Sequence, residues 1–142
     1  MATHDVLHGI GVSAGTAAAP AAIVQPAPGV DTTEPGSVDA AADGARVREA
    51  LAAVSTRLKE RAANAPEETK AILKATAQLA GDRGLAKAVD KKLKKGLGVT
   101  QAVHDAVEDY AQMLRSLGGY MAERATDLYD VRDRAICELR GL

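Results

Sequence analysis

Apolar residues recur at intervals of three and four through most of the chain after residue 38, which is the period of an amphipathic helix. A first helix carries a stripe made of Val47, Leu51, Val54, Leu58 and Ala62. A third helix, over about residues 100–117, carries Val103, Val107, Tyr110, Leu114 and Leu117. The last helix, over about residues 120–140, carries Met121, Ala125, Leu128, Val131, Ala135, Ile136 and Leu139. Each stripe predicts a helix with one face in a shared core.

The second helix is predicted to begin at about Ala65. Pro66 suits a first turn, where its missing N–H costs nothing, and Glu67 and Glu68 lie where the helix dipole favours negative charge. Its stripe is interrupted at Gly81–Gly84 and then resumes, the members being Ile72, Leu73, Thr76, Leu79, Leu85, Val89 and Leu93. We therefore predict one long helix that is kinked near Gly81–Gly84.

Four helices with short connections predict an all-α fold, an antiparallel four-helix bundle. Residues 1–37 differ from the rest, because Gly, Pro, Ala, Ser and Thr dominate and no helical period appears. Only residues 10–13 and 21–24 are compatible with strands, and an isolated pair of strands is marginal in water. We divide the chain into a strand-like or linker segment, residues 1–37, and a helical part, residues 38–142, and expect the first to be mobile.

Composition narrows the class of protein. The 142 residues are 46% hydrophobic but only 2% aromatic, so the core must be built from aliphatic side chains and alanine. A formal charge of −1 gives no bulk electrostatic attraction to nucleic acid or to an anionic membrane. One cysteine excludes an internal disulfide framework, and no apolar run approaches the ~18 residues of a membrane span, so we expect a cytoplasmic protein.

No group of residues predicts an active site or a metal site. His4 and His8 lie in the irregular N-terminal segment, and His104 lies beside an apolar stripe, where a surface role is expected. Cys137 is near the C-terminal end of the last helix, where the dipole disfavours a thiolate. Residues 9–15 are glycine-rich but lack the Gly-Lys-Ser/Thr of a phosphate loop, and the lysines of residues 87–95 are interpreted as a solvated helix face. These features favour a binding module.

The order of the motifs resembles a known family. A Gly9-Ile10-Gly11-Val12-Ser13-Ala14-Gly15 opening precedes a long helix, the run Glu67-Glu68-Thr69-Lys70-Ala71-Ile72-Leu73, and then Leu79 and Asp82. The most specific run comes last, Ala122-Glu123-Arg124-Ala125-Thr126-Asp127-Leu128-Tyr129-Asp130-Val131-Arg132-Asp133-Arg134. In this order and spacing the chain resembles the N-terminal, HPr-binding region of Enzyme I, the phosphoenolpyruvate-protein phosphotransferase of the bacterial phosphotransferase system.

The resemblance implies a role in sugar uptake. Enzyme I moves phosphate from phosphoenolpyruvate to its own histidine and then to a histidine of the carrier protein HPr. The family's helical subdomain is inserted in an α/β phosphohistidine subdomain, to which the strand-like segment would belong. None of the three histidines here matches the phosphohistidine, which, with the phosphoenolpyruvate and magnesium sites, is expected beyond Leu142. The resemblance therefore implies HPr docking without catalysis or a cofactor in this chain, the rest of Enzyme I being a partner if the chain is a fragment.

By position, the resemblance implies docking residues on the second helix and at the start of the last one. They are Glu67, Glu68, Ala71, Lys74, Gln78, Leu79, Asp82, Arg83, Leu85 and Arg124. The glutamates and Asp82 would form an acidic rim that steers a basic partner around a low apolar centre. Lys74 and Thr76 stand where the family often carries an acidic residue and a histidine, which bears on partner pairing more than on fold.

A generic helical adaptor or oligomerisation bundle is the alternative from another class. It predicts self-association through the stripe that runs from Val103 to Leu117, and no preference for HPr.

Overall fold

The computed structural model describes Val6 and residues 8–142, and in this range it is all-helical, without a strand. Its five helices are α1 (Ala40–Ala63), α2 (Glu67–Ala80), α3 (Arg83–Leu93), α4 (Val99–Leu117) and α5 (Gly119–Arg140). The all-α class predicted from the sequence is confirmed. None of these helices combines the length and the apolar character that crossing a membrane requires.

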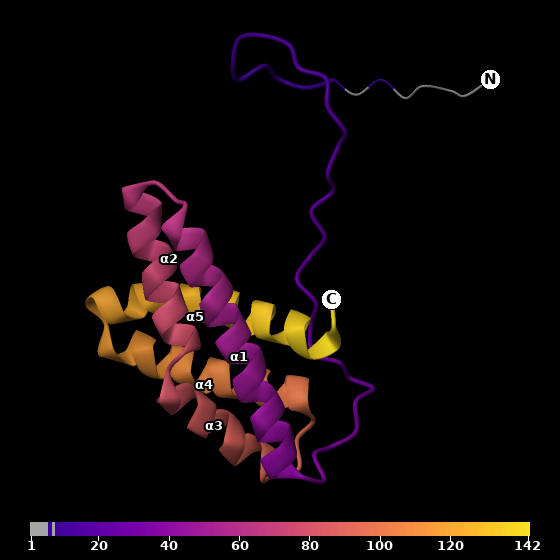
Figure 1. The fold of residues 1–142 in the computed structure, drawn as a ribbon, viewed down its shortest axis with the longest axis vertical. Helices are drawn as coiled ribbons and strands as arrows, with labels where there is room; N and C mark the ends of the chain where they lie inside the picture. Colours follow the sequence, from indigo (N-terminus) through magenta and orange to yellow (C-terminus); the bar gives the residue numbers. More distant parts are fainter. Residues whose placement is uncertain (1–5, 7) are drawn as a thin grey trace, which may run out of the picture.

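The helices form two hairpins that cross each other (Figure 1). One hairpin consists of α1 and α2, and the other of α4 and α5, while α3 packs along α4 and also contacts α1. Gly118 alone separates α4 from α5. Gly118 has φ +70° and Gly119 has φ +53°, a left-handed conformation that glycine adopts without strain, which permits this abrupt reversal. The predicted bundle of four aligned helices is thus replaced by crossed hairpins.

The predicted kinked helix is in fact two helices, α2 and α3. Asp82 has an extended backbone, φ −71° and ψ 125°, which ends the helical path after Gly81. Its side chain then restarts a helix, because Asp82 Oδ1 accepts a hydrogen bond from the Leu85 N–H at 2.9 Å. The glycines marked the break, but the N-cap residue between them turns a kink into a new helix.

The core lies where the two hairpins meet, and the predicted stripes supply most of it. Leucine and valine side chains from all helices except α2 are joined by alanines, which let the helix backbones approach closely. The buried alanines are Ala50, Ala62, Ala77, Ala80, Ala102, Ala106, Ala111, Ala125 and Ala135. Three expected stripe members are instead exposed, Leu117 and Met121 beside the α4–α5 turn and Ile72 on α2.

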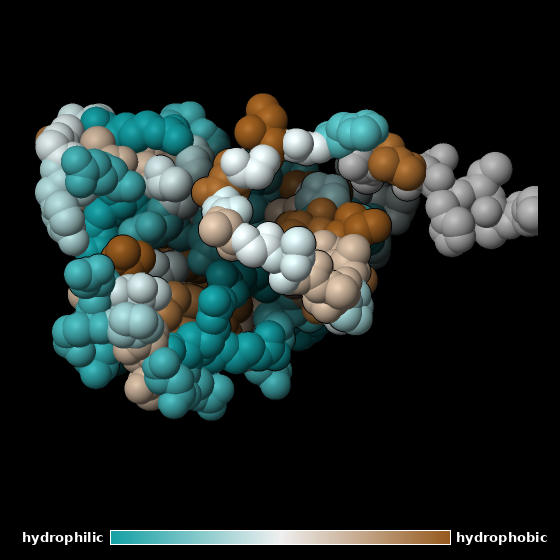
Figure 2. All heavy atoms as spheres, turned by 90° about the horizontal axis from the view of Figure 1, so that it is seen from above, coloured by the Kyte–Doolittle hydropathy of each residue, from teal (hydrophilic) through white to brown (hydrophobic). Residues whose placement is uncertain are grey.

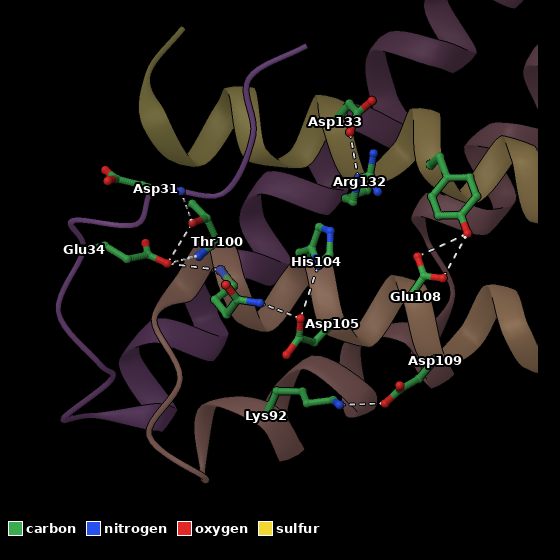
Figure 3. A network of polar contacts seen from close by, with 12 residues as sticks. Asp31, Glu34, Lys92, Thr100, His104, Asp105, Glu108, Asp109, Arg132 and Asp133 are labelled. Atoms are coloured by element: carbon green, nitrogen blue, oxygen red, sulfur yellow. Dashed lines mark hydrogen bonds and ion pairs between the residues drawn. The ribbon is translucent and has the colours of Figure 1, made fainter.

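The end of the N-terminal segment is fixed to α4 through one carboxylate (Figure 3). Glu34 Oε1 accepts hydrogen bonds from the N–H groups of Thr100 and Gln101, at 2.7 and 3.1 Å, and from the Thr100 hydroxyl at 2.7 Å. The Thr100 hydroxyl in turn accepts from the Asp31 N–H at 2.9 Å. The cap position of α4 is Gly98, which has no side chain, and Glu34, 66 positions before Thr100, provides the capping carboxylate. We call this set of contacts the Glu34 clamp.

The Glu34 clamp predicts that even a small side chain at Gly98 lowers the free energy of unfolding. A Cβ atom there would lie 2.5 to 2.7 Å from three atoms of the Glu34 side chain. Gly98→Ala is therefore expected to displace the carboxylate and lower the free energy of unfolding by about 1–2 kcal/mol, as loss of an N-cap does. Urea denaturation measures this. Gly29→Ala is the control, because a Cβ at Gly29 meets open space, and equal midpoints for the two variants would contradict the clamp.

Farther toward the N-terminus, the described chain extends away from the helices (Figure 1). The apolar side chains of Ile10, Val12, Ile23 and Val24 are more than four-fifths exposed. Apolar side chains of this segment stand out from the surface when the molecule is seen from above (Figure 2). The strand-compatible runs therefore form no strand here. Mobility of the segment stays a prediction for residues 9–24, whereas Asp31, Glu34 and Ser37 are hydrogen-bonded to the start of α4 and the loop before it.

Candidate functional site

The outward face of α2 begins with two exposed carboxylates at the positive end of the helix. Pro66 occupies the cap position and makes no side-chain hydrogen bond to the first turn. Glu67 and Glu68 follow in that turn, both exposed, and only Lys70 approaches them, at 3.4 Å from a Glu67 carboxylate oxygen. This end of α2 thus keeps a net negative charge, since Lys70 offsets only one of the two carboxylates, and it suits a basic partner.

Small and polar side chains continue this face along α2. Ala71, Lys74 and Gln78 are exposed, while Leu79 is half-buried against the core. The opposite face is fixed to α1, where the buried Ser55 hydroxyl donates to the Ala77 carbonyl at 2.9 Å. These exposed side chains are therefore held on a helix that is well anchored from its other side.

Arg124 joins the start of α5 to α2. Its guanidinium donates to the Ala75 carbonyl at 3.1 Å and to the Tyr120 hydroxyl at 3.2 Å, and its Cζ lies 5.7 Å from the centre of the Tyr120 ring. Its Nε is buried and has no hydrogen-bond partner within the described part of the chain. Arg124 therefore lies next to α2, as the predicted site requires, and it also holds the two helices in register.

The carboxylate at the α2–α3 junction, that of Asp82, is already used in hydrogen bonds within the fold. Asp82 Oδ1 caps α3 and also accepts from the Tyr110 hydroxyl at 3.3 Å. Burial raises the pKa of Tyr110, and the nearby Asp82 charge raises it further, so the phenol stays protonated and remains a donor. Asp82 thus has a structural role besides any part in the rim, while the neighbouring Arg83 is exposed.

Leu85 is the predicted site residue that the structure removes from the surface. Its side chain is 1% exposed and packs in the core with Val89 and Leu93. Because α3 is a separate helix capped by Asp82, its buried face is set independently of α2. Leu85 therefore cannot form part of a docking face in this fold.

Four exposed apolar residues lie close in sequence to residues of the candidate site. The sequence analysis did not assign them to it. Ile72 of α2 is 62% exposed, Leu117 is 63%, Tyr120 is 66% and Met121 is 40%. Tyr120 contacts Arg124 directly, which places it beside α2. No signal in the sequence indicated that these side chains are exposed, since an apolar residue in or beside a stripe predicts burial. We add Ile72 and Tyr120 to the candidate site.

The two histidines in the described range, His8 and His104, do not contribute to this face. His104 is half-buried on α4, with its Nδ1 3.2 Å from Asp105 Oδ1, as Figure 3 shows. His8 is exposed in the N-terminal segment, and His4 lies outside the described residues. Within the described range no three His, Cys, Asp or Glu side chains come together as metal ligands, and Cys137 is half-buried.

Comparison with known families and proteins identifies relatives of this chain. The family model described as PEP-utilising enzyme, N-terminal, matches residues 8–124. The chain is 36% identical over 104 residues to a phosphoenolpyruvate-protein phosphotransferase of Streptomyces coelicolor, covering 73% of this chain and 19% of that protein. It is 34% identical over 96 residues to a protein of the same name from Haloferax volcanii, covering 65% and 17%. The chain therefore spans about a fifth of the length of these relatives.

Two solved structures share the fold. A structure described as the N-terminal domain of nitrogen Enzyme 1 superposes with a TM-score of 0.65 at 27% identity, over 78% of this chain and 48% of that chain. A solution structure of Enzyme I superposes with a TM-score of 0.64 at 30% identity, over 79% and 49%. Both matches cover about half of the solved chain, so the shared fold concerns a part of each.

Proposed function

This chain belongs to the N-terminal family of PEP-utilising enzymes, and from that premise we propose that it is the HPr-docking part of an Enzyme I of the phosphotransferase system. The proposal assigns it binding and not catalysis. The docking surface consists of the outward face of α2 together with the start of α5. In this role the chain acts in the cytoplasm, where the complete enzyme moves phosphate from phosphoenolpyruvate to HPr for sugar uptake. The phosphohistidine subdomain and a magnesium-dependent phosphoenolpyruvate site are proposed for that complete enzyme.

The observation that carries the proposal is the free face of α2. Glu67, Glu68, Ala71 and Gln78 are all exposed on one well-anchored helix, and Arg124 brings α5 to its side. A low centre with charged residues at its edge is the anatomy of a protein interface. Ile72 and Tyr120 add apolar area that a partner could bury.

The alternative adaptor function finds less support. It required the stripe from Val103 to Leu117 to be available for self-association. Val103, Val107 and Leu114 are buried inside the fold, and only Leu117 of that stripe is largely exposed. The stripe is therefore used to pack α4 and has little apolar surface left for a second copy.

A titration with HPr tests the proposal. The chain labelled with ¹⁵N is titrated with HPr from the same source, and amide shifts are followed by NMR. We expect shifts confined to the face of α2, the α2–α3 junction and residues around Tyr120 and Arg124. Amides of the opposite side, such as those around Arg46 and Arg134, are the internal control. An absence of shifts at millimolar HPr would contradict the docking function.

A further inference from the structure

A stripe of positive charge runs along the exposed face of α3 and the turn after it, and of its residues only the first, Arg83, belongs to the candidate docking residues named above. Six of the chain's 18 lysine and arginine residues lie within residues 83–95, a range with a single acidic residue. Five of them are exposed and spaced to share one side of this segment; these form the basic stripe: Arg83, Lys87, Lys91, Lys94 and Lys95.

The charge of the basic stripe is not neutralised by its surroundings. None of its five residues forms an ion pair with another described residue. Asp90, the one acid in the range, is held by Arg48 of α1 at 2.9 Å. The sixth cation, Lys92, points to α4 and pairs with Asp109 at 2.7 Å (Figure 3). The stripe therefore keeps its full charge.

The character of the stripe restricts what it can bind. The apolar residues of α3, Leu85, Val89 and Leu93, are buried on the other side of the helix, so none is free to insert into a membrane. No aromatic residue occurs between 83 and 95 to stack on a base. The chain as a whole carries a charge of −1, which opposes binding to a polyphosphate backbone. An acidic protein surface is the occupant that fits.

The stripe begins where the candidate docking surface ends. Arg83 follows Asp82 of that surface directly, and Lys87 lies one helical turn, roughly 6 Å, farther on. Relative to the Debye length of about 8 Å at physiological salt, Arg83 and Lys87 therefore lie close enough to act on a partner docked on α2, and the farther lysines continue the same sign of charge. The opposite end of α2 carries Glu67 and Glu68, and thus charge changes sign from one end of the α2–α3 pair to the other.

We propose that the basic stripe of α3 steers an acidic patch on the same HPr that docks on α2. This inference rests on the proposed docking function and specifies its partner: a carrier whose docking side has a basic patch for Glu67 and Glu68 and an acidic patch for the stripe. Opposite charges at the two ends of the α2–α3 pair fix one orientation of the carrier. Carriers without the acidic patch associate more slowly, so the stripe selects among them.

Lys87 gives a graded test, since it is exposed in the middle of α3, away from the helix ends. The association rate with HPr from the same source is measured at low salt by stopped flow. We expect Lys87→Gln to slow association about twofold and Lys87→Glu about fourfold, the charge changing by one and by two. Both differences should vanish at about 0.5 M NaCl, where such forces are screened.

Lys59→Glu is the matched control, because Lys59 is an exposed lysine of α1 with no ion pair in the described structure, and the change in net charge is the same. We expect its rate to stay close to that of the unsubstituted chain. Equal rates for Lys87→Glu and Lys59→Glu would overturn the inference, and faster association of Lys87→Glu would show that HPr is basic at this point. Failure of the unsubstituted chain to bind HPr would instead overturn the docking function itself, and the inference with it.

Discussion

Leu85→Ala is expected to lower the free energy of unfolding by about 3 kcal/mol, within the range for leucine-to-alanine changes at buried positions. Leu85 is 1% exposed and packs with Val89 and Leu93, on the side of α3 that faces α1 and α4. Truncation leaves a cavity there, and the surrounding helices can close it only in part. Urea denaturation followed by circular dichroism measures the change.

Leu117→Ala is the control for this effect. Leu117 is 63% exposed, so the same change of side chain should cost less than about 0.5 kcal/mol. The pair also decides what Leu85 does. Unchanged stability in Leu85→Ala, together with weaker HPr binding, would place Leu85 on the docking surface and contradict the burial that the structure gives it.

Ala71→Arg is expected to weaken HPr binding about 30-fold, or about 2 kcal/mol, without destabilising the fold. Ala71 is exposed at the centre of the α2 face, and a long side chain there separates the two surfaces over the whole contact. The new charge also opposes the acidic rim that attracts a basic partner. Calorimetric titration with HPr gives the affinity, and thermal denaturation checks the fold.

Ala45→Arg tests whether that effect is specific to the site. Ala45 is also an exposed alanine within a helix, near the start of α1, and the substitution adds the same side chain and charge. Its affinity for HPr should match that of the unsubstituted chain. If both arginine variants bind HPr as well as the unsubstituted chain does, the docking surface is not on α2.

The sequence predicted the helices well where one period continued without interruption. The stripes of α1 and α4 are buried almost as predicted, because spacing alone determines which side of a straight helix faces inward. The prediction failed at Asp82, where a side-chain cap restarts the helix. The period placed Leu85 in the apolar stripe, and α3 does bury it, so the error lay in the docking role that the family resemblance implied for Leu85.

Contacts between distant residues account for what the sequence could not predict. Glu34 caps a helix that begins 65 residues later, and no local pattern relates a glutamate in a proline-rich segment to Val99. The site was located by family resemblance, since exposed acids in a first helical turn are common without any partner. Its attachment through Arg124 to the Ala75 carbonyl depends on how the two hairpins cross.

The Glu34 clamp also determines how a mechanical force would travel through the molecule. Tension on the N-terminal segment reaches α5 first, where Arg140 donates to the Gly29 carbonyl, and then α4 through Asp31, Glu34 and Thr100, before it reaches α1. The α1–α2 hairpin is therefore shielded from movements of the segment that precedes it. A partner docked on α2 would stay bound while the N-terminal segment moves, because the Glu34 clamp holds the end of that segment in place.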